Sequence, residues 1–268
     1  MALLHSLTRR RALALAAALA LTACAGPGSR PAGTEIHVMT SGGFTAAYND
    51  LRPAFEKKTG HSVQTAYGAS MGAASDSIPS RLNRGEPADV VILARSALDA
   101  LVKDGKVVAG SQVDLVRSAI GFAVKKGEPR PDISTVDALK RTLLAAPSIA
   151  YSASASGTYY ETELLKTLGL EAQVKPKSRR ILSERVGTIV ARGEAALGLQ
   201  QVSELLPIEG IDYIGPLPAE VQRVTVFSAG IATAAKQPEA ARELIRYLGS
   251  AAAAPAIAKT GLEPITSR

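Results

Sequence analysis

Four short turns hold the residues of this chain that could do chemistry. In each turn, a serine or an arginine stands between a segment with a strand pattern and a segment with a helix pattern. The four turns are Ser41-Gly42, Ser70-Met71, Ser156-Gly157 and Arg185-Val186. Such turns leave backbone N–H groups unpaired at a helix start, where the helix dipole also favours negative charge. A serine before a helix can also serve only as an N-cap. Four such turns in one chain favour binding of a compact anion.

The elements that must position these turns alternate along the chain. Hydrophobic periodicity predicts strands at 35–39, 61–66, 90–93, 115–124, 148–151, 195–200, 211–214 and 222–233. It predicts helices at 44–58, 73–83, 96–103, 134–144, 158–168, 187–192 and 238–248, with an alanine-rich helix near the end. This alternation indicates an α/β fold of mostly parallel sheets with helices on both faces. In such sheets the turns converge at the carboxyl ends of the strands, where ligands bind.

Residues 68–72 read Gly-Ala-Ser-Met-Gly and match the G-x-S-x-G nucleophile elbow. That fold needs a histidine downstream of its serine, but the three histidines (His5, His37 and His61) all precede Ser70. A Ser-His hydrolase is therefore excluded. We interpret the glycines as places where the backbone approaches a ligand, to which Ser70 donates a hydrogen bond.

Composition excludes several classes of function. Two histidines of the mature chain and one cysteine that would carry a lipid are too few for an ordinary zinc site, and no P-loop motif is present, so we expect no metal and no cofactor. Aromatic residues make up 4% of the chain, which argues against stacking on sugars or bases. Lysine and arginine are dispersed, so we expect no nucleic-acid partner. The net charge of +7, about +4 without the leader, favours small anions.

The N-terminus reads as an export signal. Basic residues at 9–11 precede an apolar run at 12–23, and Leu-Thr-Ala-Cys at 21–24 matches a lipobox. We therefore predict a signal peptide at 1–24, a flexible tether at 25–33, and a periplasmic protein whose sole membrane contact is a lipid on Cys24. The alternative is a plain secretory signal with an incidental cysteine.

Two plausible crossover points, near Ser111 and Thr225, divide the rest of the chain. They predict one lobe from residues 34–114 plus 227–268 and a second lobe from 115–226. We expect the protein to be a monomer.

Several motifs resemble the periplasmic molybdate-binding proteins of ABC importers. They are Ser41-Gly42-Gly43, Ser70-Met71-Gly72, the run Arg-Leu-Asn-Arg-Gly-Glu-Pro-Ala-Asp at 81–89 and the run Arg-Gly-Glu-Ala-Ala-Leu-Gly at 192–198. The resemblance implies a two-lobed type II periplasmic-binding-protein fold that closes, about a two-segment hinge, on a small anion destined for an ABC permease. It also implies that Ser41 and Ser70 hold the anion from one lobe. Backbone amides near Ser156-Gly157 and Val186 would hold it from the other.

Other residues depart from that pattern. Gln201 stands where the family uses a ligand tyrosine, and Gly42-Gly43 makes the first turn roomier than one serine needs. Three arginines that follow strands or stand at turns could pair with carboxylates, or could form only surface salt bridges: Arg95, Arg117 and Arg185. The variant pattern is similar to a branch of the family that contains aconitate isomerase.

Alternative functions therefore remain open at this point. The first is capture of a molybdate-like oxyanion or a polycarboxylate for an ABC importer, and the second is isomerisation of cis- and trans-aconitate on the same fold. An isomerase needs a base that removes a proton next to a carboxylate, and the candidates are Tyr151, Tyr159 and Glu184. A third possibility is a binding protein without a cognate permease.

Overall fold

A computed structural model describes residues 33–266 of the chain. The predicted signal peptide and its lipidation site, Cys24, lie outside these described residues. Within the described part, no helix is long and apolar enough to cross a membrane.

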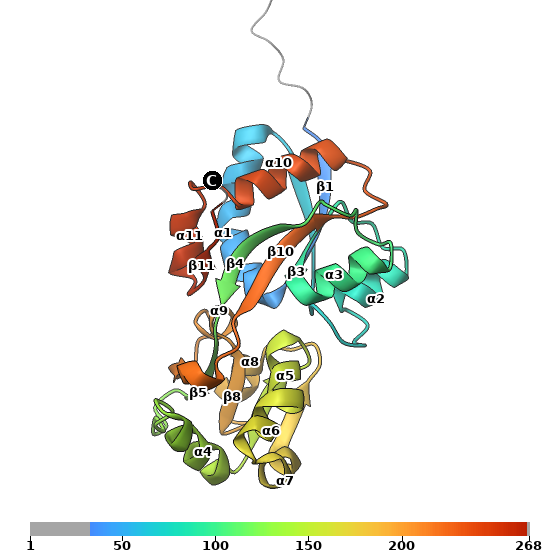
Figure 1. The fold of residues 1–268 in the computed structure, drawn as a ribbon. Helices are drawn as coiled ribbons and strands as arrows, with labels where there is room; N and C mark the ends of the chain where they lie inside the picture. The colour runs from blue at the N-terminus through green and yellow to red at the C-terminus, as the bar shows by residue number, and fades with distance from the viewer. Residues whose placement is uncertain (1–32, 267–268) are drawn as a thin grey trace, which may run out of the picture. The chain divides into compact units, whose positions relative to one another are not determined.

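The first lobe is built on a six-stranded sheet of order β11-β4-β10-β3-β1-β2. Its strands are β1 (Glu35–Ser41), β2 (Ser62–Gly68), β3 (Val90–Ala94), β4 (Val113–Ser118), β10 (Thr225–Ile231) and β11 (Glu263–Pro264). Its helices are α1 (Gly42–Thr59), α2 (Ile78–Asn83), α3 (Arg95–Lys103), α10 (Pro238–Leu248) and α11 (Ala254–Lys259). Figure 1 shows α1 and α10 at one side of this sheet and α3 with α2 at another.

Strand β3 explains why this sheet is covered on both faces. Its residues are all apolar, and successive side chains of a strand point to opposite faces. Val90 and Ile92 pack in the core beneath α1 and α10, whereas Val91 and Leu93 pack in the core beneath α2 and α3. Burial on both faces is typical of central strands in α/β sheets.

The second lobe is built on a five-stranded sheet of order β7-β6-β8-β5-β9. Its strands are β5 (Ile120–Lys125), β6 (Ile149–Ser152), β7 (Ser178–Ile181), β8 (Leu197–Gln201) and β9 (Ile211–Pro216). Its helical segments are α4 (Val136–Ala145), α5 (Ala155–Tyr159), the π-helix η1 (Tyr160–Leu164), α6 (Leu165–Leu168), α7 (Glu171–Val174), η2 (Lys175–Lys177), α8 (Val186–Ala191), α9 (Val202–Leu205) and η3 (Ala219–Val221). Residues of α6 and α7 pack in one core and residues of α8 in another.

The chain passes between the two lobes twice. It leaves the first sheet at Ser118, enters the second at Ile120, and returns between Pro216 and Thr225. The predicted two-lobed α/β fold is confirmed. The expected single strand over 115–124 is wrong, because β4 and β5 belong to different sheets. Both predicted lobe boundaries fall inside strands of the first sheet, and the division of the chain into lobes stays a prediction.

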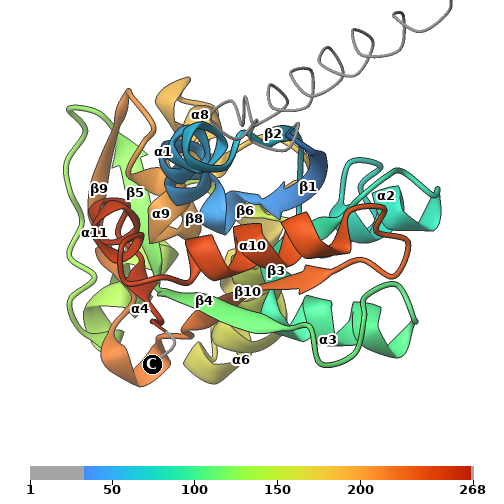
Figure 2. The ribbon, with the colours of Figure 1, turned by 90° about the horizontal axis from the view of Figure 1, so that it is seen from above.

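The sheets are mixed rather than mostly parallel. β1 pairs with β2 and β3 in parallel, and β6 pairs with β7 and β8 in parallel. Strands next to the crossings run the other way: β10 is antiparallel to β3 and β4, and β5 is antiparallel to β8 and β9. Figure 2, seen from above, shows β4 and β10 side by side.

Two predicted helix starts are wrong. The segment after Gly72 is a loop, and α2 begins at Ile78, because the Ser77 side chain accepts a hydrogen bond from the backbone of Ser80 as its N-cap. The helix predicted to start at residue 134 is α4, which begins at Val136, because the hydroxyl of its N-cap residue Thr135 accepts from the Ala138 backbone.

Candidate ligand-binding site

A cavity of 210 Å³ lies between the two lobes. Residues of both lobes line it. They are Gly42, Thr45, Tyr67, Gly68, Ala69 and Asp76 from the first lobe, and Ser152, Ala153, Ser154, Ile181, Leu182, Ser183, Glu184, Arg185, Gln200 and Glu204 from the second lobe. Three larger hollows, of 810, 740 and 550 Å³, each involve one lobe alone. The cavity between the lobes stands at the carboxyl ends of β1, β2, β6 and β7, where α/β proteins bind ligands.

Two of the four predicted turns line this cavity, and the other two adjoin residues that line it. Gly42 and Arg185 line it directly, Ala69 lines it beside the Ser70 turn, and Ser154 lines it just before the Ser156 turn. The turns therefore converge from elements that are far apart in the sequence.

Helix α1 presents its first turn to the cavity. Ser41 is the N-cap residue but makes no side-chain capping bond, and its hydroxyl is buried without a hydrogen-bond partner in the described part of the chain. The Thr40 hydroxyl is likewise buried and has no hydrogen-bond partner among the described residues. Gly42 faces the cavity, whereas Gly43 packs against Phe227, where an added Cβ would stand 2.1 Å from the ring. The start of this long helix is therefore suited to negative charge.

Glu204, on α9, places a carboxyl group in the same cavity. The residue is 8% exposed, and its Oε1 accepts a hydrogen bond of 2.9 Å from Gln200 Nε2. A Cβ added to Gly42 would stand 1.9 Å from Glu204 Oε1, so the carboxyl group lies against the start of α1. Burial raises the pKa of Glu204 to about 7, although Arg185 and the bond from Gln200 act to lower it.

Arg185 brings a positive charge to the cavity. It is the N-cap residue of α8, and no carboxylate lies within ion-pair distance of it among residues 33–266. The neighbouring Glu184 also lines the cavity, but both of its oxygens bind Arg192, which lowers the pKa of Glu184. Arg185 is therefore the cation of the cavity that is available to a ligand.

The Ser70 turn supports the cavity from behind. Ser70 is fully buried, and its hydroxyl accepts a hydrogen bond of 3.0 Å from the Ala94 backbone. Its own backbone N–H donates to the Ser154 hydroxyl of the other lobe, at 3.2 Å. Met71 accepts a hydrogen bond from Thr158 through its sulfur. Neither Ser70 nor Met71 lines the cavity.

The turns of the second lobe are also partly satisfied internally. The Ser156 and Ser152 hydroxyls are hydrogen-bonded at 3.1 Å, and a Cβ on Gly157 would stand 1.6 Å from the Ser152 carbonyl oxygen. The Val186 backbone N–H, predicted to be bare, donates to Gln200 Oε1 at 3.0 Å. That amide is therefore occupied by a side chain of the protein.

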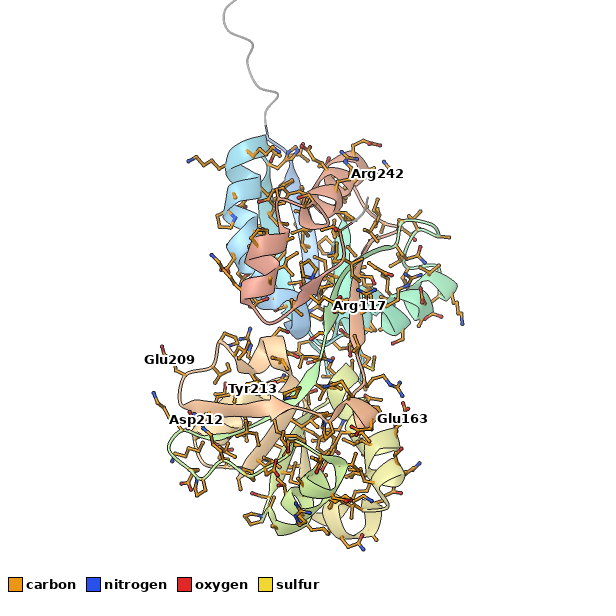
Figure 3. All side chains as sticks on the ribbon, turned by 60° about the vertical axis from the view of Figure 1, so that its left-hand side comes forward. Arg117, Glu163, Glu209, Asp212, Tyr213 and Arg242 are labelled. Carbon is orange, nitrogen blue, oxygen red and sulfur yellow. The ribbon has the colours of Figure 1, made fainter. Side chains whose placement is uncertain are left out.

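Three predicted ligand residues lie away from the cavity. Arg95 pairs with Asp99 and Asp114, at 2.9 and 2.7 Å. Arg117, labelled in Figure 3, pairs with Glu263 on the surface at 3.0 Å. Gln201 donates to the Thr225 hydroxyl at 2.9 Å.

The two tyrosines considered as bases lie in the second lobe outside the cavity. The Tyr151 ring packs against Tyr160, with centroids 5.0 Å apart, and the Tyr159 hydroxyl donates to the Val221 carbonyl at 2.7 Å. Burial raises the pKa of both hydroxyl groups.

Gln200 and Glu204 are the site residues that sequence reasoning missed. Both belong to the short segment around β8 and α9, and α9 has only four residues, too few to show a helical period. The available signal was a charged residue within an apolar run, since Glu204 is followed by Leu205 and Leu206. No group of acidic, histidine or cysteine side chains in the described residues could hold a metal ion.

Residues 36–263 match the model of the bacterial extracellular solute-binding protein family. The chain belongs to this family. Aconitate isomerase of Pseudomonas sp. is 46% identical over 235 residues, which cover 88% of this chain and 90% of that protein. The molybdate-binding protein ModA of Azotobacter vinelandii is 29% identical over 248 residues, with the same coverage. A solved structure of the Azotobacter vinelandii periplasmic molybdate-binding protein superposes with a TM-score of 0.68 at 20% identity, and covers 87% of this chain and 100% of that one.

Proposed function

We propose that this protein binds a small polycarboxylate between its lobes and isomerises it, as the Pseudomonas relative does with aconitate. The identity of 46% over nearly the full length of both proteins supports this proposal. The family and the leader sequence support a periplasmic location, and the lipobox supports an anchor on Cys24. No nucleic acid and no cofactor enter the proposal.

The observation that carries the proposal is a protonatable carboxyl group in a cavity otherwise suited to an anion. Arg185 and the start of α1 attract negative charge, yet Glu204 lies against that helix start. In a site that only captures anions, an ionised Glu204 would repel the ligand. In an isomerase, a carboxyl group with a pKa of about 7 is suited to accept and return a proton.

The reaction moves a double bond without any co-reactant. A base removes a proton from the methylene carbon next to one carboxylate of aconitate, and the C–H electron pair forms a new double bond to the central carbon. The electron pair of the old double bond moves to the far carbon, which takes up a proton. Negative charge accumulates on the substrate carboxylates in between, where Arg185 and the amides of α1 can stabilise it.

Capture of a solute for an ABC permease, by a monomeric binding protein, is the second candidate. It is favoured by the unpartnered, buried hydroxyl groups of Thr40 and Ser41 at the start of α1, which could donate hydrogen bonds to an oxyanion. The ModA relative supports the same reading.

Conversion of cis-aconitate to trans-aconitate by the purified protein, followed by chromatography, tests the proposal. We expect turnover by the wild type. An Arg185→Gln variant should lose about 10- to 100-fold in kcat/KM, since hydrogen bonds to charged groups contribute about 1.5–3 kcal/mol. The matched control is Arg117→Gln, which alters an arginine on the surface and should leave turnover unchanged. A wild type that is thermally stabilised by molybdate or aconitate but turns over neither isomer would favour the second candidate.

A further inference from the structure

A chain of hydrogen bonds fixes the Glu204 carboxyl group in the cavity. Val186 N–H donates to Gln200 Oε1 at 3.0 Å, and Gln200 Nε2 donates to Glu204 Oε1 at 2.9 Å. We infer that Glu204 is the residue that removes the substrate proton, and that Gln200 is a positioning residue that turns Glu204 Oε2 toward the substrate. This inference rests on the proposed isomerase function.

The orientation of the Gln200 amide is decided by its neighbour. A backbone N–H can only donate, so the Gln200 atom that faces Val186 must be the oxygen. The opposite end of the amide is then the NH₂ group, which can only donate to Glu204. Because Oε1 of Glu204 receives this bond, a proton carried by the carboxyl group belongs on Oε2.

The Oε2 atom of Glu204 is the carboxyl oxygen that can accept the substrate proton. Glu204 makes no second side-chain hydrogen bond within residues 33–266, and the cavity is the space that its side chain borders. The carboxyl group is therefore held at one oxygen and available at the other.

The other titratable groups of the cavity are less suited to act as the base. Both oxygens of Glu184 bind Arg192, and the Tyr67 hydroxyl donates to Asn49 at 2.7 Å. Asp76 accepts from the Ser183 hydroxyl through Oδ1 at 3.1 Å and is only partly buried, whereas Glu204 is buried. A guanidinium group offers donors and no acceptor, so Arg185 cannot act as a base. Glu204 is thus the candidate base that faces the cavity from the described residues.

Burial supports this assignment. The pKa of Glu204 is raised to about 7, so the group is ionised in a large fraction of molecules at neutral pH while remaining a useful proton acceptor. The charged or titratable groups that line the same cavity are Tyr67, Asp76, Glu184 and Arg185.

Replacing the carboxyl group by an amide tests the role of Glu204. We expect Glu204→Gln to lower kcat by about 100-fold or more, because a positioned base contributes about 10²- to 10⁴-fold. Aconitate should still raise the melting temperature of this variant. The matched control is Glu209→Gln, the same chemical change at an exposed position that Figure 3 shows pointing away from the lobe. Glu204→Asp, which keeps the charge but shortens its reach, should also lose turnover. A rise of its melting temperature with aconitate would show that the loss is not a folding defect.

Removing the donor tests the role of Gln200. Gln200→Met takes away a hydrogen bond that lowers the pKa of Glu204, so the lower midpoint of the pH–kcat profile should rise by about one pH unit. Gln200→Glu should raise it as well, because a like charge replaces the donor. A merely structural role would lower stability without moving this midpoint.

The outcomes separate the two levels of the proposal. No turnover by the wild type overturns the isomerase function and this inference with it. Turnover by both the wild type and Glu204→Gln overturns the inference alone. Loss of aconitate binding together with turnover in Glu204→Gln also overturns it, because the carboxyl group would then serve binding. An unmoved pH midpoint in both Gln200 variants removes the positioning role.

Discussion

Burial and neighbouring charge act in opposite directions on the protonation of the Glu204 carboxyl group. Its carboxyl group has lost most of its contact with water, which favours the neutral form, while Arg185 and the Gln200 donor favour the ionised form. Burial has the larger effect, so the folded protein holds this proton more tightly than the unfolded chain does.

This difference predicts how stability depends on pH. The pKa of Glu204 rises from 4.5 to about 7 on folding, so its contribution is fully present below pH 4.5 and is lost as the pH rises through 7. At pH 8 the wild type should have lost up to about 3 kcal/mol of unfolding free energy relative to pH 4.5 through this group. Glu204→Gln should lack this component. Urea unfolding of both proteins across that range measures it, and parallel curves would contradict the raised pKa.

At the residue scale, local chemistry places some residues near the cavity. Gly42 and Arg185 were predicted to contact a ligand from their positions at turns, and both line the cavity; their contact with a ligand stays a prediction. Glu204 could not be found in this way, because its burial depends on contact with α1, far away in the sequence. Arg95, at the start of α3, looked equally available, but it pairs with Asp99 on the same helix and with Asp114 on β4.

Helix α1 begins with two glycines, and a different contact favours glycine at each position. A Cβ on Gly42 would stand 1.9 Å from the end of the Glu204 side chain, which can rotate away. A Cβ on Gly43 would stand 2.1 Å from the buried ring of Phe227, which cannot. One glycine therefore gives access to the site, and the other allows close packing.

Alanine substitutions should separate these two reasons. Gly43→Ala should destabilise the protein by about 1–3 kcal/mol, the usual range for overpacking a core. Gly42→Ala should cost much less stability but should lower turnover sharply, because it displaces the Glu204 carboxyl group. Urea unfolding and isomerisation assays on both variants provide the comparison. Equal stability losses would mean that the Gly42 position is as rigid as that of Gly43.

At the element scale, strong periodicity predicted type and bounds, and tertiary contacts decided the rest. Helix α10 spans Pro238–Leu248 as expected, and Gly169 ends α6 in the left-handed conformation with φ of 70°. The 115–124 segment is apolar except for Arg117 and Ser118, and two polar residues were not enough to indicate that the chain changes sheets at Ala119. The acidic residue of the 81–89 motif has a structural role, since Asp89 accepts backbone hydrogen bonds from His37, Lys236 and Gln237.

At the scale of the whole molecule, several hydrogen bonds join the lobes around the cavity. The Ser203 hydroxyl donates to the Gly43 carbonyl at 2.7 Å, the Ser70 backbone donates to Ser154, and Ser183 donates to Asp76. A two-lobed fold connected by two short segments is expected to open and close around its ligand. These hydrogen bonds form only when the lobes are in contact, so they should stabilise the closed form over the open form.

Ser203→Ala tests this coupling without altering the lining of the cavity. Ser203 does not border the cavity, so losing its bond should act through the equilibrium between open and closed forms. We expect KM for aconitate to rise by about 2- to 10-fold, which corresponds to one hydrogen bond of about 0.5–1.5 kcal/mol. Ser250→Ala is the control, because the Ser250 hydroxyl also donates to a backbone carbonyl but within one lobe. Equal KM values in the two variants would show that this bond does not govern closure.

The position of β10 also determines when each lobe can be completed. This strand lies between β3 and β4, so the first sheet lacks an interior strand until Ile231 has emerged, whereas the second sheet needs only residues 120–216. A chain that appears N-terminus first therefore leaves the facing edges of β3 and β4 unpaired through the whole interval in which the second lobe folds. Unpaired strand edges attract other chains, so the newly made protein is most vulnerable to aggregation during that interval.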